Sequence, residues 1–85
     1  MLTKEQVETL KRSRKGGRNR VARAMELANV TQVQIADATG FTQPYISKIK
    51  NGEYSDLPGE TMRTFAEFFG CAIEDLFPAR EAVAS

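Results

Sequence analysis

The chain has 85 residues, enough for one small domain with a modest hydrophobic core. Its composition, 41% hydrophobic and 27% charged, excludes a fully disordered chain and a collagen-like fibre. One cysteine and no histidine exclude an internal disulfide, a zinc cluster of cysteines and histidines, and a Ser-His-Asp triad. No apolar run reaches the ~20 residues of a membrane span and no signal peptide is visible, so we expect a cytoplasmic protein with no membrane partner.

The formal net charge of +1 conceals two parts of opposite sign. Residues 1–25 carry eight basic and two acidic side chains, a net charge of +6. Residues 26–85 carry four basic and nine acidic side chains, a net charge of −5. This asymmetry indicates either a basic surface for a polyanion or an ordinary solvated helix with several arginines.

The first expected element is a helix over residues 3–14, because Thr3 and Gln6 stand at the spacing of a capping box. The adjacent glycines Gly16-Gly17 should end this helix, since glycine is costly inside a helix. Residues 1–17 are therefore expected to form a basic, partly helical extension that is hinged onto the rest and peripheral to it.

Two helices are expected next along the chain. The first covers residues 18–28, and Asn29 is a suitable left-handed terminator for it. The second begins after Thr31, which stands at capping-box spacing from Gln34, and it must end at Gly40.

A fourth helix is expected over residues 42–50. Thr42 is its N-cap candidate, and Pro44 lies in the first turn, where a missing N–H does no harm. The turn residues Asn51-Gly52 should end this helix.

The C-terminal third predicts one long helix and one short helix. The long helix opens after Pro58 and closes at Gly70, and the short helix covers residues 73–77 before Pro78. Residues 79–85 form a tail with few apolar anchors. No segment alternates apolar and polar residues as a strand would, so the expected fold class is all-α.

The segment around Gly40 has the pattern of two helices joined by a tight turn. Gly40 supplies a positive φ, Ala36 is small where the helices cross, and Phe41, Ile46 and Ile49 would face the core. The residues left to face outward are Gln43, Pro44, Tyr45, Ser47 and Lys48. Amide and ammonium groups reach base edges in a DNA major groove, although a short αα-hairpin in a helical bundle has the same pattern.

Residues 18–78 resemble the helix-turn-helix family of the phage repressor and Cro proteins, the xenobiotic-response-element-like regulators. The matching positions occur in order and at the family's spacing: Thr31-Gln32, Ile35-Ala36, Gly40, Thr42-Gln43, Ile46-Ser47, Ile49, Asn51-Gly52, Phe65-Ala66, Phe69-Gly70 and 73–77. The resemblance implies a compact five-helix DNA-binding domain of the lambda-repressor type, preceded here by an extra N-terminal helix.

The resemblance also implies roles for individual residues. The helix over residues 42–50 would enter the major groove, with base-reading residues Gln43, Pro44, Tyr45, Ser47 and Lys48. Phosphate contacts would come from Gln32, Thr42, Lys50 and Asn51. Met25 and Lys50 stand where relatives often have an Arg–Glu ion pair, so that pair is absent here, and Pro44 offers only a methylene surface suited to a thymine methyl.

Basic residues near the N-terminus have two interpretations each. Three of them lie along the first core helix and either contact phosphates or form a solvated face: Arg18, Arg20 and Arg23. Four others form either a basic arm that follows DNA or a charged leader: Lys11, Arg12, Arg14 and Lys15.

Most aromatic residues of the C-terminal third are interpreted as core, since a small chain needs them for stability. Phe68 lies off the stripe of Met62, Phe65 and Phe69. It is therefore a candidate, with Phe77 and Val83, for a dimer or partner surface. The cysteine, Cys71, is interpreted as a small hydrophobe rather than a redox sensor.

These observations predict a non-enzymatic regulator of bacterial or phage origin that occupies an operator on double-stranded DNA, as a homodimer and without cofactor or metal. One alternative is a protein-interaction module of the same fold, such as the antitoxin of a toxin–antitoxin pair. An enzyme is a third possibility, but no spacing places acidic, lysine, tyrosine or serine residues in a recognisable catalytic set.

Overall fold

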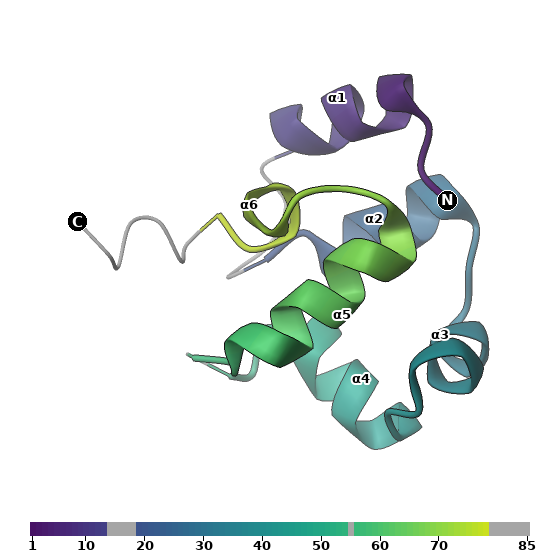
Figure 1. Cartoon of the computed structure of the whole chain (residues 1–85), viewed down its shortest axis with the longest axis vertical. Coiled ribbons are helices and arrows are strands. Elements are labelled where there is room, and N and C mark those ends of the chain that lie inside the picture. The colour runs from purple at the N-terminus through teal and green to yellow at the C-terminus, as the bar shows by residue number, and fades with distance from the viewer. Residues whose placement is uncertain (14–18, 55, 79–85) are drawn as a thin grey trace.

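The computed structural model describes residues 1–13, 19–54 and 56–78. These residues contain six α-helices and no strand (Figure 1). In chain order the helices are α1 (Lys4–Arg12), α2 (Val21–Ala28), α3 (Gln32–Thr39), α4 (Gln43–Lys50), α5 (Gly59–Phe69) and α6 (Ile73–Leu76). The predicted all-α fold is confirmed, with five helices after the N-terminal one. None of the described helices is long and apolar enough to cross a membrane.

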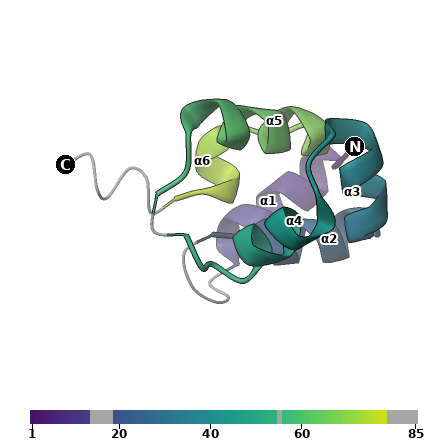
Figure 2. The same cartoon turned by 90° about the horizontal axis from the view of Figure 1, so that it is seen from below.

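Helix α5 carries the centre of the core. Met62, Phe65, Ala66 and Phe69 recur at spacings of three and four residues, and all four are buried. Figure 2 shows α5 and α6 on one side of the molecule and α2 and α4 on the other, with α3 at one end. Fully buried side chains from the other five helices complete the core: Leu10, Val21, Ala24, Ile35, Ile46, Ile49 and Leu76.

Helix α1 has the predicted capping box. The Thr3 Oγ1 accepts from the Gln6 backbone N–H at 3.1 Å, and the Gln6 Oε1 accepts from the Thr3 backbone N–H at 2.9 Å. The helix ends at Arg12, two residues before the predicted Arg14, because Ser13 is extended with φ −75° and ψ 134°. The predicted break at residues 16 and 17 lies outside the described residues.

The prediction that α1 is peripheral is wrong. Leu2 and Leu10 belong to the buried core, and the Leu2 backbone N–H donates to the Phe69 carbonyl at 2.8 Å. The Gln6 Nε2 donates to the Leu27 carbonyl, also at 2.8 Å. Helix α1 therefore closes one side of the core, although a domain boundary near residue 17 stays a prediction.

Helix α2 begins at Val21, later than the predicted start near Arg18. The Asn19 Oδ1 accepts from the Val21 backbone N–H at 2.9 Å, which forms an Asx turn ahead of the helix. The helix ends at Asn29, which has the predicted left-handed conformation with φ 57°.

Helix α5 has the predicted ends, and α6 is one residue shorter than predicted. Pro58 precedes α5, and Gly70 follows it with a left-handed φ of 76°. Helix α6 opens where the Asp75 Oδ2 accepts from the Ala72 backbone N–H at 3.1 Å, and it stops one residue before the predicted end at Phe77. The predicted tail over residues 79–85 lies outside the described residues.

Candidate nucleic-acid interface

Helices α3 and α4 form a helix-turn-helix whose ends are set by short-range hydrogen bonds. The Thr31 Oγ1 accepts from the Gln34 backbone N–H at 3.2 Å, and the Gln34 Oε1 accepts from the Thr31 backbone N–H at 2.8 Å. Gly40 ends α3 with φ 84°. The Thr42 Oγ1 accepts from the Tyr45 backbone N–H at 3.3 Å and caps α4. The three caps predicted at residues 31, 40 and 42 are confirmed.

The turn between the two helices is held by its own side chains. The Thr39 hydroxyl donates to the Ile35 carbonyl at 2.7 Å and accepts from the Phe41 backbone N–H at 3.2 Å. The Phe41 ring is stacked on Phe65 of α5 with ring centroids 5.6 Å apart. Phe41 therefore fills the space beside the turn as predicted, and it anchors the helix-turn-helix to the core.

The orientation of α4 about its own axis follows from its two isoleucines. Ile46 and Ile49 are fully buried, so they fix which face of the helix turns away from the core. Three of the predicted base-reading residues are exposed, namely Gln43, Pro44 and Lys48. A fourth, Ser47, is half-buried. The structure thus places them together on the outward side of α4, and their contact with bases stays a prediction.

Tyr45 does not share this outward face, contrary to the prediction. Its ring is half-buried and makes edge contacts with Phe41 and Tyr54, with centroid distances of 5.3 Å and 5.7 Å. Its hydroxyl lies 3.3 Å from the Thr61 Oγ1 of α5. The ring fills the space between α4 and the first turns of α5, because burying an aromatic ring outweighs solvating it.

Four of the residues predicted to contact phosphates, Gln32, Thr42, Lys50 and Asn51, lie beside the two ends of α4. The Gln32 Nε2 lies 3.5 Å from the Gln43 carbonyl, so the N-termini of α3 and α4 meet. Thr42 and Asn51 are exposed at the two caps of α4, and Lys50 is half-buried in its last turn. Helix N-termini present unpaired backbone N–H groups that bind anions, so this placement suits a DNA backbone.

Two of the three arginines predicted to contact phosphates are engaged within the protein. The Arg20 Nε donates to the Ser13 carbonyl at 3.0 Å, and its Nη1 donates to the Asp75 carbonyl at 3.2 Å. The Arg23 Nη1 pairs with the Glu26 Oε1 at 3.0 Å. The two Arg20 contacts tie the start of α2 to the ends of α1 and α6, whereas the Arg23 pair lies within α2. Phosphate contact by Arg20 and Arg23 stays a prediction. Arg18 lies outside the described residues.

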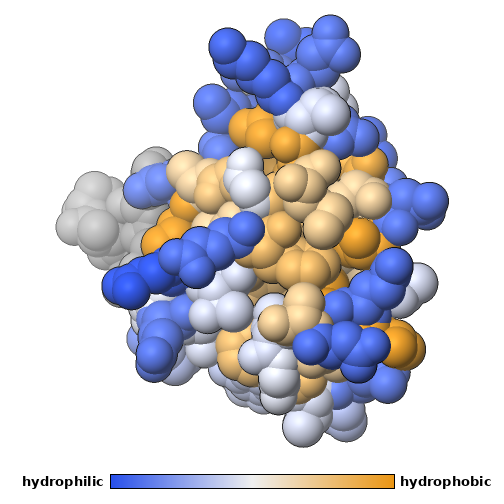
Figure 3. Space-filling model, turned by 45° about the vertical axis from the view of Figure 1, so that its right-hand side comes forward, coloured by the Kyte–Doolittle hydropathy of each residue, from blue (hydrophilic) through white to orange (hydrophobic). Residues whose placement is uncertain are grey.

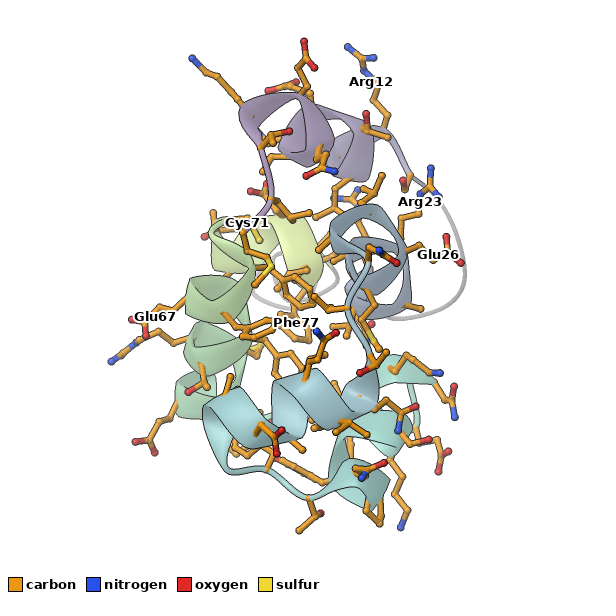
Figure 4. All side chains as sticks on the ribbon, turned by 90° about the vertical axis from the view of Figure 1, so that its right-hand side faces the viewer. Arg12, Arg23, Glu26, Glu67, Cys71 and Phe77 are labelled. Carbon is orange, nitrogen blue, oxygen red and sulfur yellow. The ribbon has the colours of Figure 1, made fainter. Side chains whose placement is uncertain are left out.

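The described part of the basic N-terminal segment lies away from α4. Figure 1 shows α1 and α4 at opposite ends of the molecule, and Figure 4 places Arg12 and Arg23 near each other on the α1 side. The Lys11 Nζ lies 3.7 Å from the Glu8 Oε2. Two other members of the predicted arm, Arg14 and Lys15, lie outside the described residues. Lys11 and Arg12 are therefore not neighbours of the outward face of α4.

One of the three residues predicted to form a partner surface belongs to the core. Phe77 is 5% exposed and makes an edge contact with Phe65, so the expectation that it lines a surface is wrong. Phe68 is half-buried against Phe69, with ring centroids 5.0 Å apart. Val83 lies outside the described residues. Figure 3 shows apolar residues at the centre of one face, surrounded by hydrophilic ones.

Cys71 has the character of a small hydrophobe, as predicted. It is half-buried and packs against the core. The pKa of its thiol is raised to about 11, chiefly by burial and to a lesser extent by the negative charge of Asp75, while the N-terminal amino group acts in the opposite direction. The described residues contain no cluster of three or more potential metal ligands from histidine, cysteine, aspartate and glutamate.

One residue that the sequence analysis did not single out connects α2 to α4. The Asn19 Nδ2 donates to the Ile49 carbonyl at 2.8 Å. An asparagine just before a helix is a signal for a turn or cap, but its partner 30 residues away leaves no signal in the sequence.

Met25 and Lys50 stand where relatives often have an Arg–Glu ion pair. Met25 is buried and Lys50 is half-buried. Within the described ranges, no ion pair joins α2 to α4.

Comparison with known proteins agrees with this geometry. A family model described as Helix-turn-helix matches residues 21–76, about two thirds of the chain. Searches among curated proteins and among solved structures gave no match. The matched residues run from the first residue of α2 to the last residue of α6. The chain therefore belongs to the helix-turn-helix family of the repressor and Cro type.

Proposed function

We propose that this protein is a sequence-specific DNA-binding regulator of transcription that occupies an operator with α4 in the major groove. The family is a DNA-binding one rather than a family of enzymes. The observation that carries the proposal is the outward face of α4, where Gln43, Pro44 and Lys48 are exposed while Ile46 and Ile49 are buried. Such a helix presents hydrogen-bonding groups on a rigid support.

The chemistry of this face suits three different base-pair edges. The Gln43 amide carries a donor and an acceptor and matches the N6 and N7 of adenine, whereas the Lys48 ammonium matches the acceptors O6 and N7 of guanine. Pro44 offers an apolar surface for a thymine methyl. Gln43 and Lys48 are five residues apart, which is roughly 7.5 Å along a helix axis. That distance is close to two base-pair steps of about 3.4 Å each.

Phosphate contacts would set the register of the protein on the duplex. Gln32 and Thr42 lie at the N-terminal end of α4, and Lys50 and Asn51 at its C-terminal end. Contacts at both ends would hold the helix along the groove without reading sequence. A homodimer would read two half-sites of a palindrome, and bound protein would block or recruit polymerase.

The test is selection of bound duplexes from a random pool, followed by titration of the selected site with variants. Gln43→Ala and Lys48→Ala should each cost about 1–3 kcal/mol of binding free energy and relax preference at one base position. Lys4→Ala is the matched control for Lys48→Ala, because it also removes an exposed lysine but lies on α1. An unchanged selected motif in both α4 variants would show that α4 is not the reader.

A second candidate function is a protein-interaction module of the same fold, such as an antitoxin. The net charge of −5 over residues 26–85 favours it, because a DNA-binding surface is usually more basic. Salt dependence separates the two functions. Each phosphate contact gives a slope of about −0.9 in a plot of log affinity against log salt concentration, and a module that does not bind DNA gives no such slope.

A further inference from the structure

Two side-chain amides hold the backbone of α4, one at each end. At the N-terminal end the contact is long, 3.5 Å from the Gln32 Nε2 to the Gln43 carbonyl. At the C-terminal end the Asn19 Nδ2 donates to the Ile49 carbonyl at 2.8 Å, and that carbonyl also accepts from the Gly52 backbone N–H at 3.0 Å. Both lone pairs of the Ile49 carbonyl are therefore used, and the last turn of α4 is tied to a residue outside the helix-turn-helix.

Asn19 itself is held on both sides. Its Oδ1 accepts from the Val21 backbone N–H at 2.9 Å, and the residue is only 9% exposed. A planar amide with both ends bonded to backbone groups transmits the position of one segment to the other. Asn19 therefore fixes the start of α2 relative to the last turn of α4. Within the described residues, no ion pair joins these two helices.

Apolar packing does not replace this contact. Ile46 and Ile49 fix which face of α4 is buried, but apolar contacts are non-directional and leave the tilt of a short helix poorly determined. A hydrogen bond is directional, and a buried one is costly to leave unmade. Lys48 directly precedes the bonded Ile49 and Ser47 lies in the same turn, so this tilt sets where both side chains point.

We propose that Asn19 is a positioning residue for DNA recognition, whose side-chain amide holds the reading helix α4 at the tilt that base contact requires. The inference rests on the proposed function of α4. Asn19 touches no base in this role; it acts through the Ile49 carbonyl and the turn that carries Ser47 and Lys48.

The test compares two substitutions that remove the donor and keep an acceptor for the Val21 N–H. Asn19→Asp keeps the shape of the side chain and adds a charge, whereas Asn19→Ser is neutral and too short to reach Ile49. Thr3→Ala is the control, because it removes a capping hydrogen bond of α1, at the opposite end of the molecule from α4. All variants are full-length chains, and each is compared at a temperature where circular dichroism shows it folded.

Two measurements follow on each variant. The first is the ratio of affinities for the selected duplex and for a scrambled duplex of the same length and composition. Both Asn19 variants should lower this ratio roughly threefold to tenfold, and the control should leave it unchanged. The second is amide hydrogen exchange without DNA at Asn51, whose backbone N–H donates to the Ser47 carbonyl at 3.0 Å. Exchange there should accelerate in both Asn19 variants, by more than their loss of global stability explains.

Three results would overturn the inference: exchange at Asn51 that follows global stability as in the control, an unchanged affinity ratio in both Asn19 variants, or a loss confined to Asn19→Asp, which would be a charge effect. Failure of the proposed function looks different. The parent protein would then select no sequence, while hydrogen exchange would still decide whether Asn19 holds α4.

Discussion

Replacing Gly40 with alanine tests the turn on which the helix-turn-helix depends. Gly40 has φ 84° and ψ −3°, and a Cβ at this position would meet no atom within 4 Å. The penalty is therefore the backbone strain of a left-handed L-residue alone, about 1–2 kcal/mol of unfolding free energy. That is a large fraction of the ~5 kcal/mol typical of the least stable small domains.

Two companion substitutions calibrate this value. Gly40→Asn should cost less than Gly40→Ala, because asparagine tolerates the left-handed region and Asn29 already adopts it here with φ 57°. Gly70→Ala should cost more. Gly70 has a similar φ of 76°, but its Cβ would lie 3.3 Å from the Met1 backbone nitrogen and would displace the N-terminal segment that packs there.

Thermal unfolding followed by circular dichroism measures these differences. In a domain of this size 1 kcal/mol shifts the melting temperature by roughly 4–8 °C, so Gly40→Ala should melt about 4–16 °C below the parent. The expected order of melting temperatures is parent, Gly40→Asn, Gly40→Ala and then Gly70→Ala. A Gly40→Ala variant that melts with the parent, or an asparagine variant less stable than the alanine one, would refute the argument from backbone strain.

Three further predictions follow from burial and charge. Leu10→Ala should lower the unfolding free energy by about 2–5 kcal/mol in urea titration, because Leu10 is fully buried, whereas Lys11→Ala beside it should stay within about 0.5 kcal/mol. Neutralising Lys11 and Arg12 together should leave the salt slope of DNA binding unchanged, since α1 lies away from α4, whereas Lys50→Ala should flatten the slope by about 0.9. The Cys71 thiol should react with alkylating reagents at a rate that is half-maximal near pH 11 in the folded protein and near pH 9.0 in urea. Because folding raises this pKa, the contribution of the neutral thiol to the free energy of unfolding is complete below pH 9.0 and is lost as the pH rises toward 11.

The helix ends and the turn were predictable because their determinants are local. Thr31, Gly40 and Thr42 cap their helices through bonds that span at most four residues, so the spacing of residue types is sufficient to find them. The buried face of α4 followed from the spacing of Ile46 and Ile49 for the same reason. The sequence by itself therefore determined the helical fold class, the position of the helix-turn-helix and most of the outward face of α4.

Only the tertiary structure decided where the other polar and aromatic side chains went. Arg20 reaches a carbonyl 55 residues away, Asn19 one 30 residues away, and Tyr45 a hydroxyl 16 residues away. An arginine, asparagine or tyrosine in or just before a short helix can, as far as its local sequence shows, face solvent, contact DNA or bond to an internal polar group. The choice depends on which polar groups come within hydrogen-bond reach once the helices have packed, and that is a property of the assembled core rather than of any one segment.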